Sequence, residues 1–101
     1  MTKLVHCKCE PYDVLIDRTT IFGNPFIVDK DGDREIVLRK HQCWLYDWII
    51  FEEEIQIGRF NNRVVFENLF QLKNKIIACW CKPRPCHGDI LVKLVHKFYG
   101  D

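Results

Sequence analysis

Residues 75–98 read KIIACWCKPRPCHGDILVKLVHKF. The apolar run Ile76–Trp80 predicts a buried strand, and the two prolines that follow exclude regular strand pairing or helix directly after it. An amphipathic helix begins after the loop, and Asp89 is its expected N-cap. The segment therefore predicts a strand, a sharp loop and a helix. Loops at the carboxyl ends of strands are where α/β proteins bind ligands.

The remainder of the chain predicts two short strands before a pair of helices. Residues 4–9 and 14–16 are the expected strands, and a polar, turn-rich segment then leads to Asp33 as the N-cap of a long helix. The expected helices are Arg34–Phe51 and Asn61–Lys73, with a break after the first because three glutamates follow it. This order predicts one α/β domain over residues 1–101, with at least partly parallel strands flanked by helices.

The first and the last of the expected helices each show a periodic apolar face, and these faces predict the core. The tryptophans are assigned to this core rather than to a ligand because an aromatic ring buries a large area. In the first helix the face consists of Val37, His41, Trp44, Leu45 and Trp48, and in the last it consists of Ile90, Leu91, Leu94, Val95 and Phe98.

Composition excludes some classes of protein. The formal net charge is +1, so a large basic field for non-specific nucleic-acid binding is absent. No apolar run approaches ~18 residues, so no membrane span is expected. The first residues show no signal peptide, which predicts an intracellular protein with reduced thiols and no disulfide.

The six cysteines permit a metal site in this reducing setting. Cys79, Cys81, Cys86 and His87 would make a closed zinc site of three thiols and one imidazole. Cys7 and Cys9 could add ligands from the first strand. Reduced thiols of the core or loop are the alternative, because the spacing C-x-C-x4-C-H is unlike that of the common zinc knuckles.

The same loop has the features of an anion site. Backbone amides at a helix N-terminus favour phosphate or carboxylate, and Gly88 permits close approach of the backbone. Lys82, Arg84 and His87 add side-chain donors. A turn at 23–25, which follows a strand and Arg18, predicts a second loop that meets the first around a pocket. Walker A and Cys-x5-Arg phosphatase patterns are both absent.

Nucleophilic catalysis is a third use of the loop. Cys86 is expected near a helix start, beside His87 and among cations, and those factors lower the pKa of a thiol. Cys86 is therefore the expected reactive thiol, whereas Cys79 is expected to be buried and inert. A zinc deaminase is excluded, because no His-x-Glu is present and the Pro-Cys pair lacks the second cysteine.

The motif CWCKPRPCHGDIL at residues 79–91, together with Arg18 and GNPF at 23–26, resembles domain-of-unknown-function family 4326. Its members are short proteins, many from phages, large viruses and bacteria. The upstream family motif commonly has glycine and tryptophan where this chain has Asp17 and Phe22. The resemblance covers nearly the whole chain and implies a Rossmann-like fold with a two-loop pocket, without an established activity.

These observations lead to two functional hypotheses. The first is that a phosphorylated small molecule, such as a nucleotide, binds between the loops in the cytoplasm, that of the host cell if the protein is viral. Whether the domain is an enzyme stays open; if it is, Cys86 is the nucleophile and His87 the acid or base. The alternative is a zinc-stabilised module that binds protein or nucleic acid. The expected ligand-binding residues are Arg18, Gly23, Asn24, Lys82, Arg84, Gly88 and Asp89.

Overall fold

The computed structural model describes residues 1–100. Its main sheet has the strand order β1-β5-β2, from β1 (Lys3–His6), β5 (Ile76–Cys79) and β2 (Val14–Leu15). Both edge strands run parallel to β5, so the predicted α/β class with parallel pairing is confirmed. β5 lies in the middle because its apolar residues fit a strand that is bonded on both edges. It ends at Cys79, one residue earlier than predicted.

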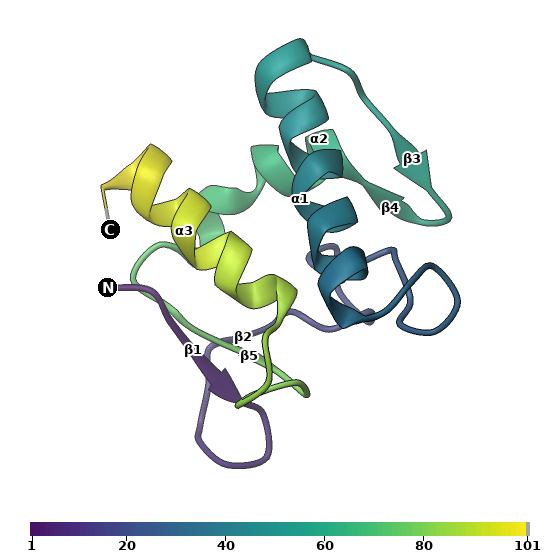
Figure 1. The fold of residues 1–101 in the computed structure, drawn as a ribbon. Helices are drawn as coiled ribbons and strands as arrows, with labels where there is room; N and C mark the ends of the chain where they lie inside the picture. Colours follow the sequence, from purple (N-terminus) through teal and green to yellow (C-terminus); the bar gives the residue numbers. More distant parts are fainter. Residues whose placement is uncertain (101) are drawn as a thin grey trace.

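Helix α3 (His87–Tyr99) packs on β1 and β5, as Figure 1 shows. Leu91, Leu94 and Val95 are buried as predicted, whereas Phe98 is 40% exposed and meets Phe66 edge to face. A Cβ on Gly88 would lie 2.7 Å from the side chains of Leu4 and Ile16. The glycine therefore lets the first turn of α3 approach the sheet closely.

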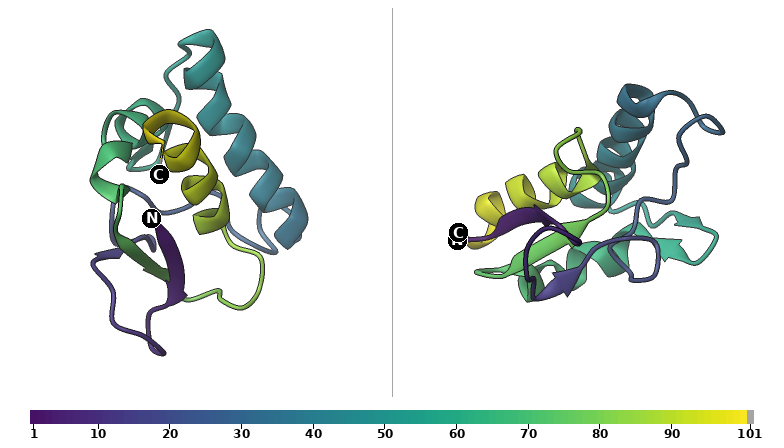
Figure 2. Two further views of the ribbon diagram at one scale, coloured as in Figure 1. Left: turned by 90° about the vertical axis from the view of Figure 1, so that its left-hand side faces the viewer. Right: turned by 90° about the horizontal axis from the view of Figure 1, so that it is seen from below.

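Helix α1 (Arg34–Phe51) lies against α3 and α2 (Figure 2). Asp33 caps it as predicted, because its Oδ1 accepts a hydrogen bond from the amide of Ile36 at 2.9 Å. The helix ends where Glu52 adopts the left-handed conformation. Four of the predicted face residues, Val37, His41, Trp44 and Leu45, are buried.

The prediction of one helix over Asn61–Lys73 is wrong. A hairpin of β3 (Gln56–Ile57) and β4 (Phe60–Asn61) precedes a short helix α2 (Asn62–Glu67) and a 3₁₀ helix η1 (Leu69–Leu72). Asn61 is the N-cap of α2, since its Oδ1 accepts from the amide of Val64 at 3.1 Å. The segment breaks because each piece packs on a different neighbour, α2 on α1 and η1 on α3.

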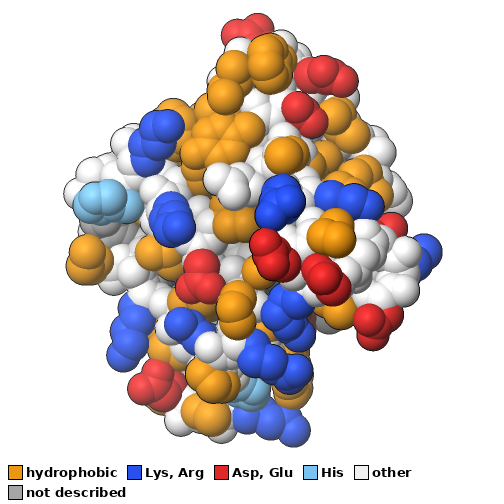
Figure 3. All heavy atoms as spheres, viewed as in Figure 1, with side chains coloured by type: hydrophobic (Ala, Val, Ile, Leu, Met, Phe, Trp, Pro, Cys, Tyr) orange, Lys and Arg blue, Asp and Glu red, His pale blue; other side chains and the backbone are white. Residues whose placement is uncertain are grey.

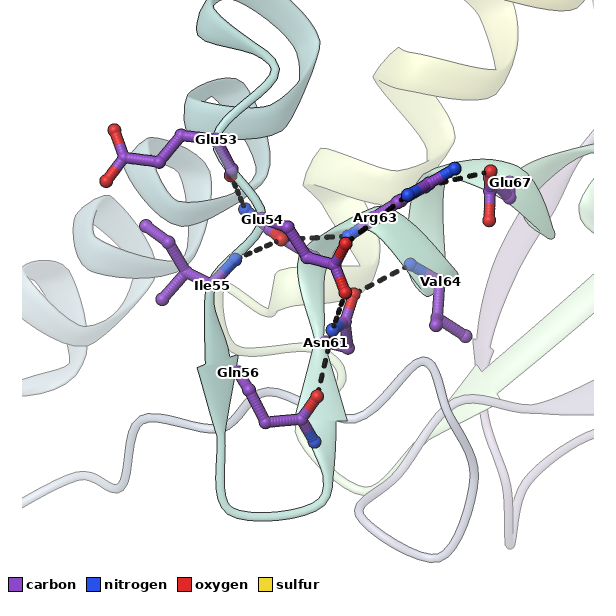
Figure 4. Close-up of polar contacts among 9 residues, drawn as sticks. Glu53, Glu54, Ile55, Gln56, Asn61, Arg63, Val64 and Glu67 are labelled. Atoms are coloured by element: carbon purple, nitrogen blue, oxygen red, sulfur yellow. Dashed lines mark hydrogen bonds and ion pairs between the residues drawn. The ribbon is translucent and has the colours of Figure 1, made fainter.

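Asn62 joins this segment to α1 from a fully buried position. Its Nδ2 donates to the carbonyls of Trp44 and Glu53 at 2.8 and 2.9 Å, and its Oδ1 accepts from the amide of Ile55 at 2.8 Å. Around it, Glu54 accepts from both Asn61 and Arg63 (Figure 4). The hairpin is thereby held at the end of α1.

Charged side chains of both signs are interspersed on the face drawn in Figure 3, which agrees with the small net charge. Among the described residues, no helix is sufficiently long and apolar to cross a membrane. The Rossmann-like arrangement is not confirmed, because the parallel sheet has three strands and α3 is the helix packed on it.

Candidate functional site

The two predicted loops meet, as expected, around a pocket of about 310 Å³. The first loop follows β2 and contributes residues 17–28, and the second joins β5 to α3. Helix α1 forms a third wall through its first turns. The lining residues are Asp17, Arg18, Thr19, Asn24, Phe26, Val28, Arg34, Val37, Leu38, Cys79, Trp80, Cys81, Cys86 and His87.

Arg18 determines the shape of the first loop. Its Nε donates to the carbonyl of Asn24 at 3.1 Å and its Nη2 to that of Phe26 at 3.0 Å. Asn24, which is buried, closes a local turn because its Oδ1 accepts from the amide of Phe26 at 2.9 Å. A Cβ on Gly23 would lie 2.6 Å from the backbone of Arg18. The loop therefore requires glycine at position 23.

Asp17 links the two loops. Its Oδ2 accepts a hydrogen bond from Trp80 Nε1 at 3.0 Å, and its Oδ1 accepts from the amide of Thr19 at 2.9 Å and from the Thr19 hydroxyl. Partial burial raises the pKa of this carboxyl, but the hydrogen bonds from Thr19 and Trp80 outweigh it, so the pKa of Asp17 is lowered. A carboxylate at this position orients Trp80 against the pocket.

At the end of the second loop, the N-cap of α3 is Cys86 and not the predicted residue, Asp89. The Sγ of Cys86 accepts from the amide of Gly88 at 3.4 Å, and Asp89 Oδ2 accepts from the amide of Cys86 at 3.1 Å. Asp89 therefore stands at the third helical position of a capping box. The prediction failed because a thiol is an uncommon cap and the sequence could not show its orientation.

This cap already uses much of the helix terminus that was expected to bind an anion. The amides of Gly88 and Asp89 bond to Cys86, at its Sγ and its carbonyl respectively. Lys82 lies 3.9 Å from the carboxylate of Asp89. Arg18 and Asn24 line the pocket, and Gly23 packs behind them. Of the other expected ligand-binding residues, Lys82, Arg84, Gly88 and Asp89 are not among the lining residues.

Sequence reasoning missed Arg34, the second cation of the pocket. It lies in the first turn of α1, and its Nη1 donates to the carbonyl of Pro85 at 3.2 Å. The sequence placed it correctly at a helix start but contained no signal that this start packs beside the cysteine loop. Trp80, which the sequence placed at the end of the buried strand, is 51% exposed and lines the pocket.

Three thiols form a cluster in the pocket wall. The Sγ atoms of Cys79, Cys81 and Cys86 lie within 4.8 Å of one another, and this cluster could hold a metal ion. Cys79 and Cys86 are buried and Cys81 is half-buried. All six cysteines are free thiols. Cys7 and Cys9 do not belong to this cluster.

The acidities of the buried pair differ from those expected. The Sγ atoms of Cys79 and Cys86 lie 2.8 Å apart, and either thiol can donate the hydrogen bond between them; this bond together with the amide of Cys81 lowers the pKa of Cys79 to about 6. The same bond, with burial, raises the pKa of Cys86. Cys79 is buried as predicted, but it is the thiol that favours the thiolate.

His87 connects the thiol cluster to Ile16, the residue that follows β2. Its Nε2 lies 2.7 Å from the carbonyl of Ile16, which can only accept, so Nε2 carries the proton. Its Nδ1, 3.5 Å from Cys86 Sγ, then holds a lone pair in the neutral ring. Burial lowers the pKa of His87, which favours that neutral form.

The fold and site define a small mixed α/β protein with a pocket that contains thiols and arginines. Residues 2–97 match the model of the family described as "Domain of unknown function (DUF4326)". The chain belongs to this family. It is 31% identical over 102 residues to the "Uncharacterized 12.4 kDa protein in nrdA-td intergenic region" of Enterobacteria phage T4, covering 100% of this chain and 83% of that protein. No solved structure matches the chain.

Proposed function

We propose that the pocket between the two loops binds a phosphorylated small molecule such as a nucleotide. The observation that carries this proposal is that Arg18 and Arg34, from different elements, line one pocket. Among the described residues, neither arginine forms an ion pair with a carboxylate. Each guanidinium has five N–H groups, and the bonds to loop carbonyls use only some of them. Donors therefore remain for a bidentate contact with phosphate.

The apolar part of the pocket suits the remainder of such a ligand. The rings of Trp80 and Phe26 both line it, and a flat base could stack on either because aromatic faces accept bases with little sequence preference. A volume of about 310 Å³ is at the lower end of the range for small-molecule sites, ~300–1,000 Å³. A mononucleotide fits this range better than a dinucleotide.

Thermal unfolding with a panel of nucleotides, sugar phosphates and inorganic phosphate tests the proposal. A ligand present at a hundred times its Kd stabilises the native state by about 2.7 kcal/mol, which raises the Tm by roughly 10–20 °C for a domain of this size. The Arg34→Gln variant should bind that ligand roughly 10- to 100-fold more weakly, because it loses a charged hydrogen bond to phosphate.

Arg39→Gln is the matched control, since Arg39 lies on the same helix, is exposed and pairs with Glu35 instead of lining the pocket. It should leave binding unchanged. The proposal is wrong if no phosphorylated compound raises the Tm, or if Arg39→Gln weakens binding as much as Arg34→Gln does.

A second candidate function, a zinc-stabilised interaction module, is favoured by the three clustered sulfurs. Thiolates are preferred zinc ligands. A fourth ligand could be His87, whose Nδ1 lone pair lies on the side of Cys86 while its other nitrogen donates to a carbonyl. Metal-binding histidines commonly make such a bond to a carbonyl.

Metal analysis of the purified protein tests this second function. This second function predicts about one zinc per chain, lost in the Cys81→Ser variant and retained in Cys43→Ser, whose thiol is exposed and does not belong to the cluster. Chelation should then lower the Tm, because a metal that binds only the native state stabilises it. Protein without metal, with all its cluster thiols reduced, would exclude this function.

A further inference from the structure

Two cysteines of the thiol cluster, Cys79 and Cys86, are both buried and hold their sulfurs close together. Cys79 ends β5 and Cys86 caps α3, so two rigid elements hold the pair across the short proline-containing loop. Their Sγ atoms are 2.8 Å apart, and the two residues are 1% and 2% exposed. Both still contribute to the wall of the pocket.

The separation is better suited to a disulfide than to a shared metal ion. Sulfurs that bind one tetrahedral zinc through bonds of about 2.3 Å lie about 3.8 Å apart. A disulfide bond is about 2.05 Å long. The 2.8 Å between the two sulfurs is closer to the second distance.

We propose that Cys79 and Cys86 form a redox-active dithiol, which a small disulfide of the glutathione class oxidises reversibly to an intramolecular disulfide. This inference is independent of the phosphorylated ligand. It uses the pocket only as the route by which a small molecule reaches two otherwise buried sulfurs.

The reaction balances as two thiol–disulfide exchanges. One thiol of the pair, as its thiolate, attacks a sulfur of the small disulfide; a mixed disulfide forms and one small thiol leaves with a proton. The second protein thiol then attacks the mixed disulfide at the protein sulfur, and the other small thiol leaves with the second proton. Two electrons pass from the pair to the small disulfide, and a reducing thiol reverses both steps.

Oxidation would change the pocket locally. The new bond would fix residues 80–85 to the end of β5. It would also remove two of the three sulfurs of the cluster, so metal binding and oxidation of the pair exclude each other. Cys81, half-buried in the same cluster, would remain a free thiol.

The test is incubation of the native protein, after its zinc content is measured, in buffers of graded oxidised to reduced glutathione, followed by alkylation and peptide mapping. We expect the loss of two alkylatable thiols and a linked peptide joining Cys79 to Cys86, both restored by excess reduced glutathione. Cys86→Ser should abolish the link and still fold, because serine is a preferred N-cap. Cys79→Ala should abolish it as well, and its thermal unfolding would show whether it folds.

Cys81→Ser and Cys43→Ser are the controls, and both should keep the link. The inference is overturned if the link involves Cys81, if glutathione remains attached to a cluster cysteine as a stable mixed disulfide, or if Cys81→Ser prevents oxidation. It is also overturned if the purified protein carries zinc and its cluster thiols resist oxidation until a chelator removes the metal. In that case the cluster is a metal site.

Discussion

Replacing Asn62 by alanine is expected to lower the free energy of unfolding by about 4 kcal/mol, because several buried groups lose their partners at once. The carbonyls of Trp44 and Glu53 and the amide of Ile55 all bond to this side chain. The Oδ1 of Asn62 also accepts from the amide of Arg63 in α2 at 2.9 Å, so the start of that helix loses a partner as well, although alanine is itself a good helix former. Denaturant unfolding followed by circular dichroism measures the loss as a lower midpoint at an unchanged slope.

Asn68→Ala provides the matched control. Asn68 Nδ2 also bonds to a backbone carbonyl, that of Val64 at 2.8 Å, but in an exposed setting. Water can replace that bond, so the expected cost is about 1 kcal/mol or less. Equal losses in the two variants would show that burial does not determine the role of Asn62, and would contradict the prediction.

The contacts of Asn62 also reach the pocket. Asn62 holds the start of the hairpin at Ile55. In that hairpin, the ring of Phe60 lies so close to Gly23 that a Cβ added to the glycine would be 2.9 Å from the ring. Gly23 in turn belongs to the loop that Arg18 shapes. The hairpin is therefore a support for the first loop, although none of its residues lines the pocket.

The sequence predicted the elements whose side chains repeat over many residues. The face of α1 from Val37 to Leu45 and the apolar β5 both follow from periodicity, and a parallel sheet follows from the order of the elements. The hairpin at 56–61 could not be predicted in this way, because each strand has two residues. Two residues contain no measurable alternation.

The site was predicted in outline. Two motifs far apart in the chain identified the loops that meet, and three of the four candidate metal ligands do lie together. Arg34 and the bond from Trp80 to Asp17 were missed, because both depend on how α1 and β5 pack beside the first loop. Only a three-dimensional arrangement shows which cations line a pocket.

As the pH falls, the free energy of unfolding is expected to decrease more steeply than protonation of surface groups alone would cause. The reason is that His41 is fully buried and neither of its ring nitrogens is hydrogen-bonded. Burial lowers the pKa of His41 well below its usual value, and the neighbouring His87, 5.4 Å away between ring centroids, lowers it further. Burial also lowers the pKa of His87. Both rings therefore remain neutral in the native state at a pH where the unfolded chain becomes protonated.

The sign of the effect follows from proton binding. Below the unfolded-state pKa of about 6.5, the unfolded chain binds more protons than the native state, so stability is present above that pH and is lost as the pH falls toward the lowered native values. Each buried histidine reduces the free energy of unfolding by up to about 1.4 kcal/mol per pH unit in this window. The pKa of Cys79, lowered from 9.0 to about 6, contributes stability that is gained as the pH rises from about 6 to 9, so its effect overlaps only the upper part of this window.

Urea unfolding at intervals from pH 6.5 to 5 measures this dependence. The His41→Leu variant should lose about half of the slope, because leucine fills the core without a titratable group and His87 still contributes. It should also unfold at no lower urea concentration than the native sequence at pH 5. If His41→Leu and the native sequence showed the same slope, the native state would have to accommodate a protonated His41, and its burial would not be the source of the acid sensitivity.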